Sequence, residues 1–562
     1  MALNLRERCT KRLVGMKAAR LPYEDEWRET ASCAQPARSR FLNKDTNQNA
    51  RQRNKKLNSS HGIFAFRTLQ GGMTSGLSSP SRPWKVLRSY DEGLMEDQEA
   101  KVWFGEVDRR MDSFLAQTNF YQAAKTGYLE MGLFGGEACV MVEHPSEGAV
   151  CHQLTAGEYW IGLGSAMTPE ALYRRVPMTV IQAVQRFPWN RLCRRIREAY
   201  DNSRYEEICN LFHAIELNDE RDPSYVDARG KMFRSVWWDE SNDTKGGSEY
   251  GACLEVSGYE EQPFWAPRWD TTGADVYGVG PGADALPDLR ELQLQTKRKG
   301  EATDFLLKPE IVAPSRVKLR RVPGSVVSAA SVDIEKVSVP YTVPYQAIDA
   351  VNQDVQRCME AIDRASYADL FMAITNMQGI QPRNVEEIAS RNEEKLTQLG
   401  PVIERVNNEK LEVAIERTLG IMSRAGLLPP PPESLAETEI KTEFVSILTQ
   451  MQRMVGLGQI ERFAGFASAT MAAHPEAKHK IAVFEMIDEY GQRAGVPPKI
   501  IIPTEQAQAS LMGEIEDQRA AAMAEQIANM APVGKVAVDA AKVAADAPPG
   551  IISPINELMP LP

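Results

Sequence analysis

Residues 277–307 read YGVGPGADALPDLRELQLQTKRKGEATDFLL, a glycine–proline segment that leads into a long stretch compatible with a helix. The segment predicts a hinge, because glycine adopts backbone angles that other residues resist and proline stiffens the bend. The hinge residues are Gly278, Gly280, Pro281 and Gly282. A helix then runs from about Asp284 to Leu307 and spans roughly 30–45 Å at 1.5 Å per residue.

A second long helix is predicted after a short insert, from about Pro344 to Phe371. Its apolar residues recur three or four positions apart, as expected for one buried stripe. They are Ile348, Val351, Val355, Met359 and Ile362. The insert, residues 309–340, is β-branched and punctuated by proline, which favours short strands and turns. Together these elements predict a stalk that projects from a body.

Basic residues cluster at two places on this predicted stalk. The first helix is polar on all sides through QLQTKRKGEATD, a pattern that favours packing on polar neighbours around a shared axis. Its Lys297, Arg298 and Lys299 would then line the axis or lie between subunits. The insert carries the second cluster, formed by Arg316, Lys318, Arg320 and Arg321. That cluster would meet an acidic partner or DNA, and a solvated strand face explains it equally well.

The chain before residue 277 reads as an α/β body, so the fold class is mixed α/β and mainly helical. Helices are predicted over residues 1–35, 96–114 and 120–133, with Trp27 anchoring the first to the body. Strands are predicted in WKVLR, ACVMVEH, AVCHQL, YWIGL, RSVWWDE and CLEVSGY.

After Phe371, the polar loop ITNMQGIQPRN precedes a long helix, residues 385–425. Gly400 and Pro401 lie in its middle and predict a kink, because proline removes a backbone donor and clashes with the preceding turn. The proline run at residues 429–432 ends this helix. A second helical group is expected over residues 433–530, and an Ala/Pro-rich tail that we expect to be mobile follows it.

Length and composition set limits on the class of protein. A chain of 562 residues is expected to form two to four structural regions. No apolar run approaches the ~18 residues that a bilayer requires, and the N-terminus has no signal-peptide core. Eight scattered cysteines without a C-x-x-C pair indicate synthesis in a reducing, cytosolic compartment.

The net charge of −11 argues against a protein that grips duplex DNA by neutralising phosphates, but it allows one that lets DNA slide past. The charge is uneven, with 14 Lys/Arg against 6 Asp/Glu in residues 1–60. A solvated helix face and a disordered arm would both produce that count.

Catalytic chemistry has no visible support in the sequence. The glycines at 278–282 lack the spacing of a nucleotide-binding turn, and no G-x-x-x-x-G-K-[ST] occurs. Cys139, His144, Cys151 and His152 match no common zinc pattern, and strand alternation would send them to different faces. We therefore expect no enzyme activity, no cofactor and no metal.

Four collinear segments resemble the portal, or head–tail connector, protein of short-tailed (podovirus-type) bacteriophages. They are FRTLQGGMTSGLSSPSRPW at 66–84, YGVGPGADALPDLRELQ at 277–293, ADLF at 368–371 and SRNEEKLTQLGPVIERVNNEKL at 390–411, followed by RAGLLPPPP. The resemblance covers roughly residues 5–430 and fades in the C-terminal quarter.

The resemblance implies a portal fold that assembles into a ring, usually of twelve subunits, with an axial channel for double-stranded DNA. It implies a wing (1–283), two stem helices (284–308 and 342–372), a clip (309–341), a tunnel loop (373–383), a kinked wing helix (384–428), a helical crown (429–530) and a flexible tail (531–562). In similar proteins the tunnel loop narrows the channel. Here the constriction would consist of Asn376, Met377, Gln378 and Gly379.

By the same resemblance, the protein is made in the host cytoplasm and ends at one capsid vertex, without a membrane. Its implied partners are further copies of itself, the terminase large subunit that supplies ATP hydrolysis, a tail adaptor or tail tube protein, and the major capsid and scaffolding proteins. Another capsid or scaffold-type structural protein is the alternative function. A DNA-processing enzyme is a weaker one, because no cluster of acidic metal ligands is evident.

Overall fold

The computed structural model describes residues 4–36, 57–89, 98–240, 253–309, 344–376, 393–432, 440–445, 457–474 and 482–494, with a few isolated positions between and after them. The chain divides into two compact units, residues 1–455 and 456–562. This division agrees with the two to four regions expected from the length.

The core of the first unit is built around α5 (Phe120–Phe134), most of whose residues are buried. Helices α1 (Leu5–Ala34), α3 (His61–Leu77) and α4 (Gln98–Gln117) pack around it. Trp27 of α1 is 3% exposed and makes edge contacts with Phe134 and Tyr277. Its predicted role as an anchor is therefore confirmed.

A five-stranded antiparallel sheet with the order β4-β5-β6-β7-β8 forms one layer of this unit. Its strands are Tyr159–Leu163, Pro169–Thr179, Ile208–Leu217, Phe233–Asp239 and Glu255–Tyr259. Strands β4, β7 and β8 were predicted from the sequence, whereas β5 and β6, the two longest, were not. Both carry charged residues that are buried because they have partners: Glu216 of β6 accepts hydrogen bonds from Tyr173 at 2.7 Å and Arg234 at 2.6 Å.

Two smaller sheets complete the body. β2 (Ala138–His144) lies between β3 (Gly148–Leu154) and the short β9 (Phe264–Trp265). β1 (Lys85–Ser89) pairs antiparallel with β10 (Ile440–Phe444). A helical group was expected over residues 433–530, but Ile440–Phe444 form a strand, because these residues complete a sheet with a strand far away in the sequence.

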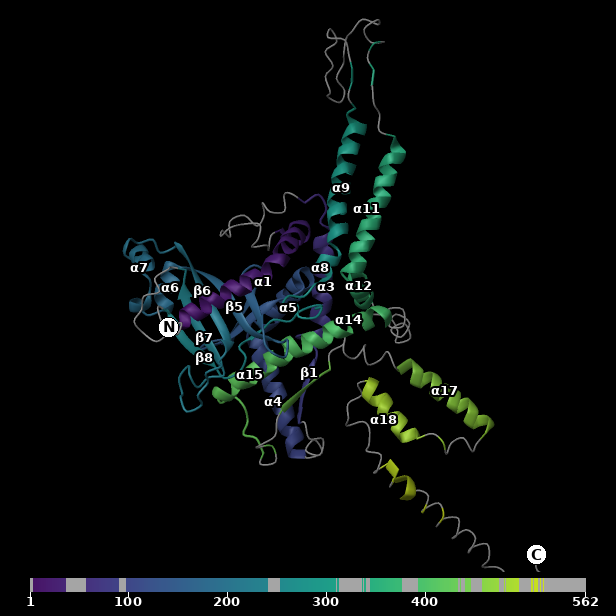
Figure 1. Cartoon of the computed structure of the whole chain (residues 1–562). Helices are drawn as coiled ribbons and strands as arrows, with labels where there is room; N and C mark the ends of the chain where they lie inside the picture. Colours follow the sequence, from purple (N-terminus) through teal and green to yellow (C-terminus); the bar gives the residue numbers. More distant parts are fainter. Residues whose placement is uncertain are drawn as a thin grey trace, which may run out of the picture. The chain divides into compact units, whose positions relative to one another are not determined.

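The predicted stalk is present and extends from the body as two helices lying side by side (Figure 1). The short α8 (Pro281–Asp284) leads into α9 (Leu286–Leu307), and the return helix is α11 (Tyr345–Ala365). The return helix ends earlier than predicted, because Tyr367 adopts a left-handed backbone angle (φ 55°) and a separate helix α12 (Ala368–Asn376) follows.

The helix predicted over residues 385–425 is described from residue 393. It consists of α14 (Glu393–Val406), a π-helical turn (Asn407–Glu412) and α15 (Val413–Arg424). Pro401 lies inside α14 with its side chain exposed, and Gly400 is buried. The kink at these two residues stays a prediction. The π-helical turn was not predicted.

In the second unit, α17 (Leu457–Ala473) packs against α18 (Val483–Ala494). The predicted tail, residues 531–562, lies outside the described residues. No helix in the described parts of the chain is long and apolar enough to cross a membrane.

Candidate functional site: the stalk and its base

The hinge packs backbone against backbone on the C-terminal end of α5. That end is capped by Gly135 in the left-handed conformation (φ 71°). A Cβ on Gly278 would lie 2.5 Å from the Gly135 carbonyl oxygen, and one on Gly282 would lie 2.1 Å from the Leu133 carbonyl oxygen. Contacts this short leave no room for any other residue.

These contacts correct the predicted reason for the glycines. Gly278, Gly280 and Gly282 are all absent from the residues with positive φ, so unusual backbone angles are not what they supply. They allow the chain to approach α5 closely. Pro281 stands in the first turn of α8, where its missing N–H is not needed and its fixed φ suits a helix start. The hinge is therefore a tightly packed junction.

Apolar side chains bury the lower part of the stalk. Leu286, Leu289 and Leu292 of α9 are buried, and Leu289 lies against α3, where a Cβ on Gly62 would come within 2.6 Å of it. The predicted stripe on the return helix is confirmed. Val355 and Ile362 are buried in the core, and Val351 and Met359 are partly buried against it. Ile348 is also buried, although it lies near the start of the return helix and outside that core.

Polar contacts tie the same region to α1 and α3. The Gln293 side chain accepts from the Asn58 and Ser59 backbone N–H groups at 2.8 and 3.0 Å and donates to the Ser59 carbonyl at 2.9 Å. His61 Nε2 lies 2.9 Å from Asp363 Oδ1, and Arg290 pairs with Glu29. Burial raises the pKa of the Asp363 carboxyl, and the neighbouring His61 opposes that rise. We call this region, up to Gln293, the stalk base.

Residues 294–307 of α9, here called the upper stalk, differ sharply from the base. None of them is buried, and the apolar Leu294, Phe305 and Leu307 are exposed, Leu307 by 72%. At the start of the return helix, Tyr345 is also exposed. An isolated stalk would gain stability by covering these side chains, so the upper stalk has the character of a contact surface.

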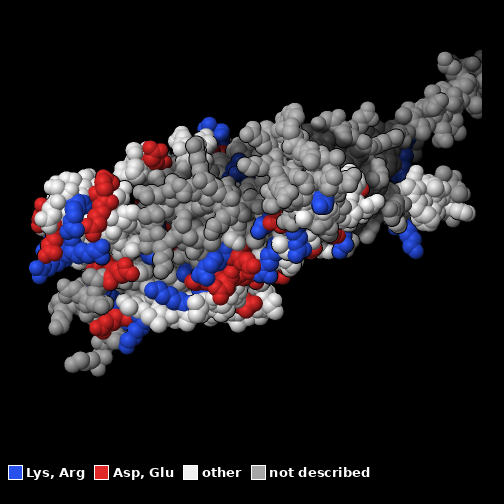
Figure 2. Space-filling view, turned by 90° about the horizontal axis from the view of Figure 1, so that it is seen from above, with Lys and Arg blue, Asp and Glu red and all other residues white. Residues whose placement is uncertain are grey.

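The predicted basic residues Lys297, Arg298 and Lys299 lie on the upper stalk. Lys297 and Arg298 are exposed, and Lys297 makes a loose ion pair with Glu301 at 3.7 Å. Lys299 is half-buried. The two stalk helices together hold six Lys/Arg and eight Asp/Glu, so the local cluster sits in a slightly acidic stalk. Figure 2 likewise shows acidic and basic side chains next to one another on the described surface.

Seven of the predicted site residues lie outside the part of the chain that the structure describes. They are Arg316, Lys318, Arg320 and Arg321, together with Met377, Gln378 and Gly379. Of the insert, the structure describes an antiparallel bridge between Val312 and Ser338. Asn376 is the last residue of α12, so the helix reaches into the predicted tunnel loop.

The body contains a buried ion pair that was not predicted from the sequence. Lys410 Nζ lies 2.5 Å from Glu137 Oε1, both side chains are 0% exposed, and the ammonium group stands over the Tyr128 ring at 3.7 Å. Burial raises the pKa of Glu137 and lowers that of Lys410. Glu137 directly precedes β2 and Lys410 lies in the π-helical turn. Because the two residues are far apart in the sequence, no local sequence pattern predicts that they pair.

A second buried pair fixes the same turn to the chain that leads to the hinge. Glu409 accepts from Arg268 at 2.8 Å, and both side chains are nearly fully buried. Arg268 also donates to the Met167 carbonyl at 2.7 Å. The neighbouring Arg405 donates to the Trp269 carbonyl at 2.8 Å. The loop before the hinge is thus held on α14 and the π-helical turn.

The cysteines and histidines considered as metal ligands do not converge. Cys139 and Cys151 are buried, whereas His144 and His152 are exposed. Among the described residues, no group of three or more His, Cys, Asp or Glu is arranged to hold a metal ion. Strand alternation places Cys139 and Cys151 on one face of the β2–β3 pair and His144 and His152 on the other, as predicted.

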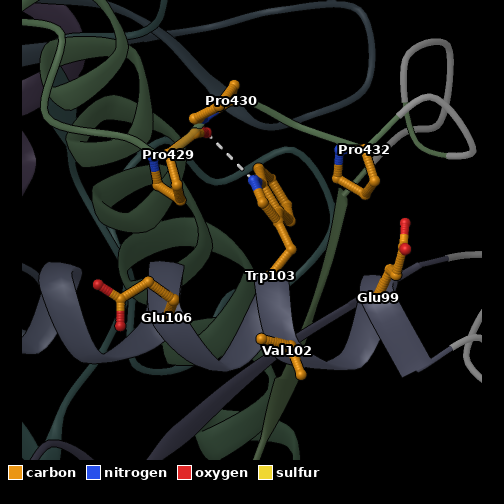
Figure 3. A pocket seen from close by; sticks show the side chains of 7 residues that line it. All are labelled: Glu99, Val102, Trp103, Glu106, Pro429, Pro430 and Pro432. Atoms are coloured by element: carbon orange, nitrogen blue, oxygen red, sulfur yellow. Dashed lines mark hydrogen bonds between the residues drawn. The ribbon is translucent and has the colours of Figure 1, made fainter.

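A groove of about 410 Å³ lies between α4 and the proline run (Figure 3). It is lined by Glu99, Val102, Trp103, Glu106, Pro429, Pro430 and Pro432. Trp103 Nε1 donates to the Pro429 carbonyl at 3.1 Å, which fixes the run on the helix. Arg109 and Arg110 hold the pKa of Glu106 at about 2. With apolar walls, two carboxylates and neither a nucleophile nor a histidine in its lining, the groove has the character of a packing site.

The sequence matches known proteins over most of its length. A family model described as bacteriophage head to tail connecting protein matches residues 6–502. The chain is 33% identical over 547 residues to a portal protein of Salmonella phage epsilon15, covering 96% of each chain. It is 32% identical over 515 residues to a probable portal protein of Bordetella phage BPP-1, covering 91% of each.

Proposed function

This chain belongs to the family of bacteriophage head-to-tail connecting proteins, and on that premise we propose that it forms a ring at one capsid vertex. The axial channel of the ring would pass double-stranded DNA inward during packaging and outward during ejection. A separate terminase would supply ATP hydrolysis, and a tail adaptor would attach later. The protein itself would have a structural role in the virion, in contact with the major capsid and scaffolding proteins.

The observation that carries the proposal is the contrast along the stalk. The base is buried and fixed by hydrogen bonds, whereas the upper stalk leaves apolar and charged side chains uncovered. In a closed ring, each subunit presents two different faces to its neighbours. Stalks packed side by side would cover Leu294, Phe305 and Leu307, which a single subunit leaves exposed.

Electron microscopy of the full-length protein, together with its mass in solution, tests the ring. We expect a closed particle with a central hole, usually of twelve subunits. A monomer, or a particle without a hole, would contradict the proposal. Leu307→Glu should weaken assembly without unfolding the subunit, because it places a charge on the proposed contact. Val226→Glu is the matched control, because Val226 is 90% exposed on the body.

The role of Lys297, Arg298 and Lys299 depends on where they lie in the ring. We propose that they line the channel or stand between subunits, and a triple substitution by alanine distinguishes the two. Intact rings with altered DNA retention would place them on the channel, because each phosphate contact adds affinity and slows release. Loss of rings would place them between subunits. If neither ring assembly nor DNA retention changes, these three residues have neither of the proposed roles.

The proposed constriction is tested separately. Deleting residues 376–379 should leave the ring assembled and impair DNA packaging or retention. If assembly is lost, the segment serves packing instead. The basic insert residues 316–321 are proposed to dock the terminase or the tail adaptor. Reversal of their charge should then abolish that binding while rings still form.

A further inference from the structure

An arginine-rich aromatic surface covers α7 and the segments on either side of it. It consists of Trp189, Arg191, Arg194, Arg195, Arg204 and Tyr205, and we call it the α7 face. Trp189 and Arg191 belong to the short helix η4 (Trp189–Arg191), and α7 spans Arg194–Asp201. In Figure 1, α7 lies on the opposite side of the first unit from the stalk helices, so the surface is separate from the site described above.

A small apolar cluster holds α7 in place and leaves its other side free. Leu192, Ile196 and Ala199 are buried with Leu211 and Trp237 of the five-stranded sheet. The side chains of Arg194 and Arg195 point away from this cluster, and they are 86% and 74% exposed. Packing therefore explains the apolar residues of α7, but it does not explain the arginines.

Positive charge exceeds what the local carboxylates neutralise. Residues 186–204 contain six arginines and no lysine. Arg194 pairs with Glu198 at 2.6 Å, whereas Arg195 and Arg204 share the single carboxylate of Glu207 at 3.3 and 3.0 Å.

Two further arginines of this segment, Arg191 and Arg197, have no carboxylate within ion-pair distance among the described residues. Arg197 Nε is also buried without an acceptor there. The exposed guanidinium groups of Arg191, Arg194 and Arg195 can therefore bind additional acceptors, whereas the buried Arg197 Nε does not reach the surface.

Aromatic rings form the centre of the same surface. Trp189 contacts Tyr200 edge to face at 5.5 Å, and Tyr200 contacts Tyr205 at 5.2 Å. Trp189 and Tyr205 nevertheless remain about 40% exposed. Trp, Tyr and Arg are the residues that dominate binding energy at protein interfaces: the two aromatic residues bury much area with few rotatable bonds, and the arginine guanidinium offers several hydrogen-bond donors in a planar arrangement.

We propose that the α7 face docks an acidic protein segment that carries a large apolar side chain. Guanidinium groups bind carboxylates in pairs of parallel hydrogen bonds, and the rings would receive the apolar side chain. DNA fits less well, because the exposed Glu198, Asp201 and Glu206 interrupt the arginines and would repel a continuous row of phosphates. Discrete carboxylates on a peptide can avoid these positions.

Binding of a labelled peptide to the full-length protein tests the proposal. The probe is fluorescein-Glu-Glu-Asp-Leu-Phe-Asp-Glu-Glu, and anisotropy is measured at 50 and 300 mM NaCl. We expect saturable binding that weakens with salt. The affinity for the probe should fall at least tenfold in the variant Arg194→Glu/Arg195→Glu and about fivefold in the variant Trp189→Ala. Replacing the acidic residues of the probe by Gln and Asn should abolish binding.

The control variant Arg28→Glu/Arg109→Glu makes the same charge change at exposed residues elsewhere and should bind normally. Equal losses in this control, or no binding at all, would overturn the proposal. Tighter binding of a 12-base-pair duplex, lost in the α7 variants, would also overturn it in favour of nucleic acid. If the charge reversal unfolds the protein, Arg194→Gln/Arg195→Gln takes its place. The test does not depend on ring formation, so its result is separate from that of the proposed function.

Discussion

Two lysine–glutamate pairs, Lys410–Glu137 in the body and Lys297–Glu301 on the upper stalk, place the same chemistry in opposite settings. The first has an N–O distance of 2.5 Å and no exposure of either side chain. The second has a distance of 3.7 Å, and its side chains are 62% and 58% exposed. Desolvation makes the buried pair costly to break, whereas water already solvates both partners of the exposed one.

The difference shows that the two regions depend on different partners. The body satisfies its charges internally, with Arg268–Glu409 and Arg234–Glu216 as further buried pairs. The upper stalk leaves charged and apolar side chains exposed, so any further partners for them must come from outside the subunit. Substitutions in the body should therefore change the stability of the subunit, whereas those on the upper stalk should change assembly and DNA passage.

The largest effect is expected from Lys410→Met. It leaves the Glu137 carboxyl buried without its partner, which costs about 3–5 kcal/mol of unfolding free energy. Chemical denaturation of the full-length protein, followed by tryptophan fluorescence, measures the loss. The double variant Lys410→Met/Glu137→Gln should recover most of it, because no charge is then left in the core. A loss below about 1 kcal/mol in the single variant would mean that this pair is no more important than a surface pair.

A pair of glycine substitutions compares the hinge with the upper stalk. Gly282→Ala places a Cβ 2.1 Å from the Leu133 carbonyl oxygen and should destabilise the subunit by about 3 kcal/mol. Gly300→Ala, in the exposed middle of α9 with no atom within 4 Å, should stabilise it by about 0.5–1 kcal/mol. Opposite signs in thermal and chemical unfolding are the expected result. The same sign for both would contradict the description of the hinge as a tightly packed junction.

A buried histidine makes the stability of the body dependent on pH. His213 stacks on Trp237 at 4.0 Å and accepts from Arg174 Nε at 2.9 Å. Burial and the charge of Arg174 lower its pKa well below 6.5. Below about pH 6.5 the unfolded chain binds a proton that the folded chain excludes, so stability is lost as the pH falls.

The free energy of unfolding, measured from pH 7.5 to 5, should therefore decline more steeply in the natural chain than in His213→Gln. The substitution removes the titrating group, although it also costs stability through the lost ring contact. Parallel pH profiles for the two chains would show that another group causes the decline.

The smallest effect is expected from Lys297→Met on the upper stalk. The exposed pair with Glu301 contributes at most about 0.5 kcal/mol, so the unfolding free energy should hardly change. A loss above 1 kcal/mol in denaturation of the isolated subunit would contradict the contrast between stalk and body. If assembly or DNA retention changes while the unfolding free energy does not, the result supports the contrast between stalk and body.

Local patterns predicted much of this fold. The three- and four-residue spacing of Val355, Met359 and Ile362 located the buried stripe of the return helix, and runs of apolar residues located β2 and β4. The strands β5 and β6 escaped prediction because Arg174 and Glu216 interrupt their apolar pattern. Their burial becomes acceptable only through His213, Tyr173 and Arg234, which come from neighbouring strands. The break at Tyr367 also has no sequence signal, since tyrosine seldom adopts positive φ.

The candidate site shows the same division. The sequence predicted a hinge at the glycines and a basic cluster at Lys297–Lys299, but it did not indicate that Leu307 and its apolar neighbours are exposed. The reason for the glycines was wrong, because their closest neighbours, Leu133 and Gly135, lie far away in the chain. The arginines of α7 attracted no notice in the sequence, since only burial of Ile196 and Ala199 reveals which side of that helix remains free.

The sequence by itself determined the two stalk helices, the polar middle of the first and the membership of a phage connector family. Helical periodicity and breakers are properties of consecutive residues, so they can be read without knowing what they contact. Only the tertiary structure decided that the hinge is a tightly packed junction, that Lys410 and Glu137 meet, and that the upper stalk stays uncovered. Those features depend on the distance between residues remote in sequence, and a one-dimensional pattern does not contain that distance.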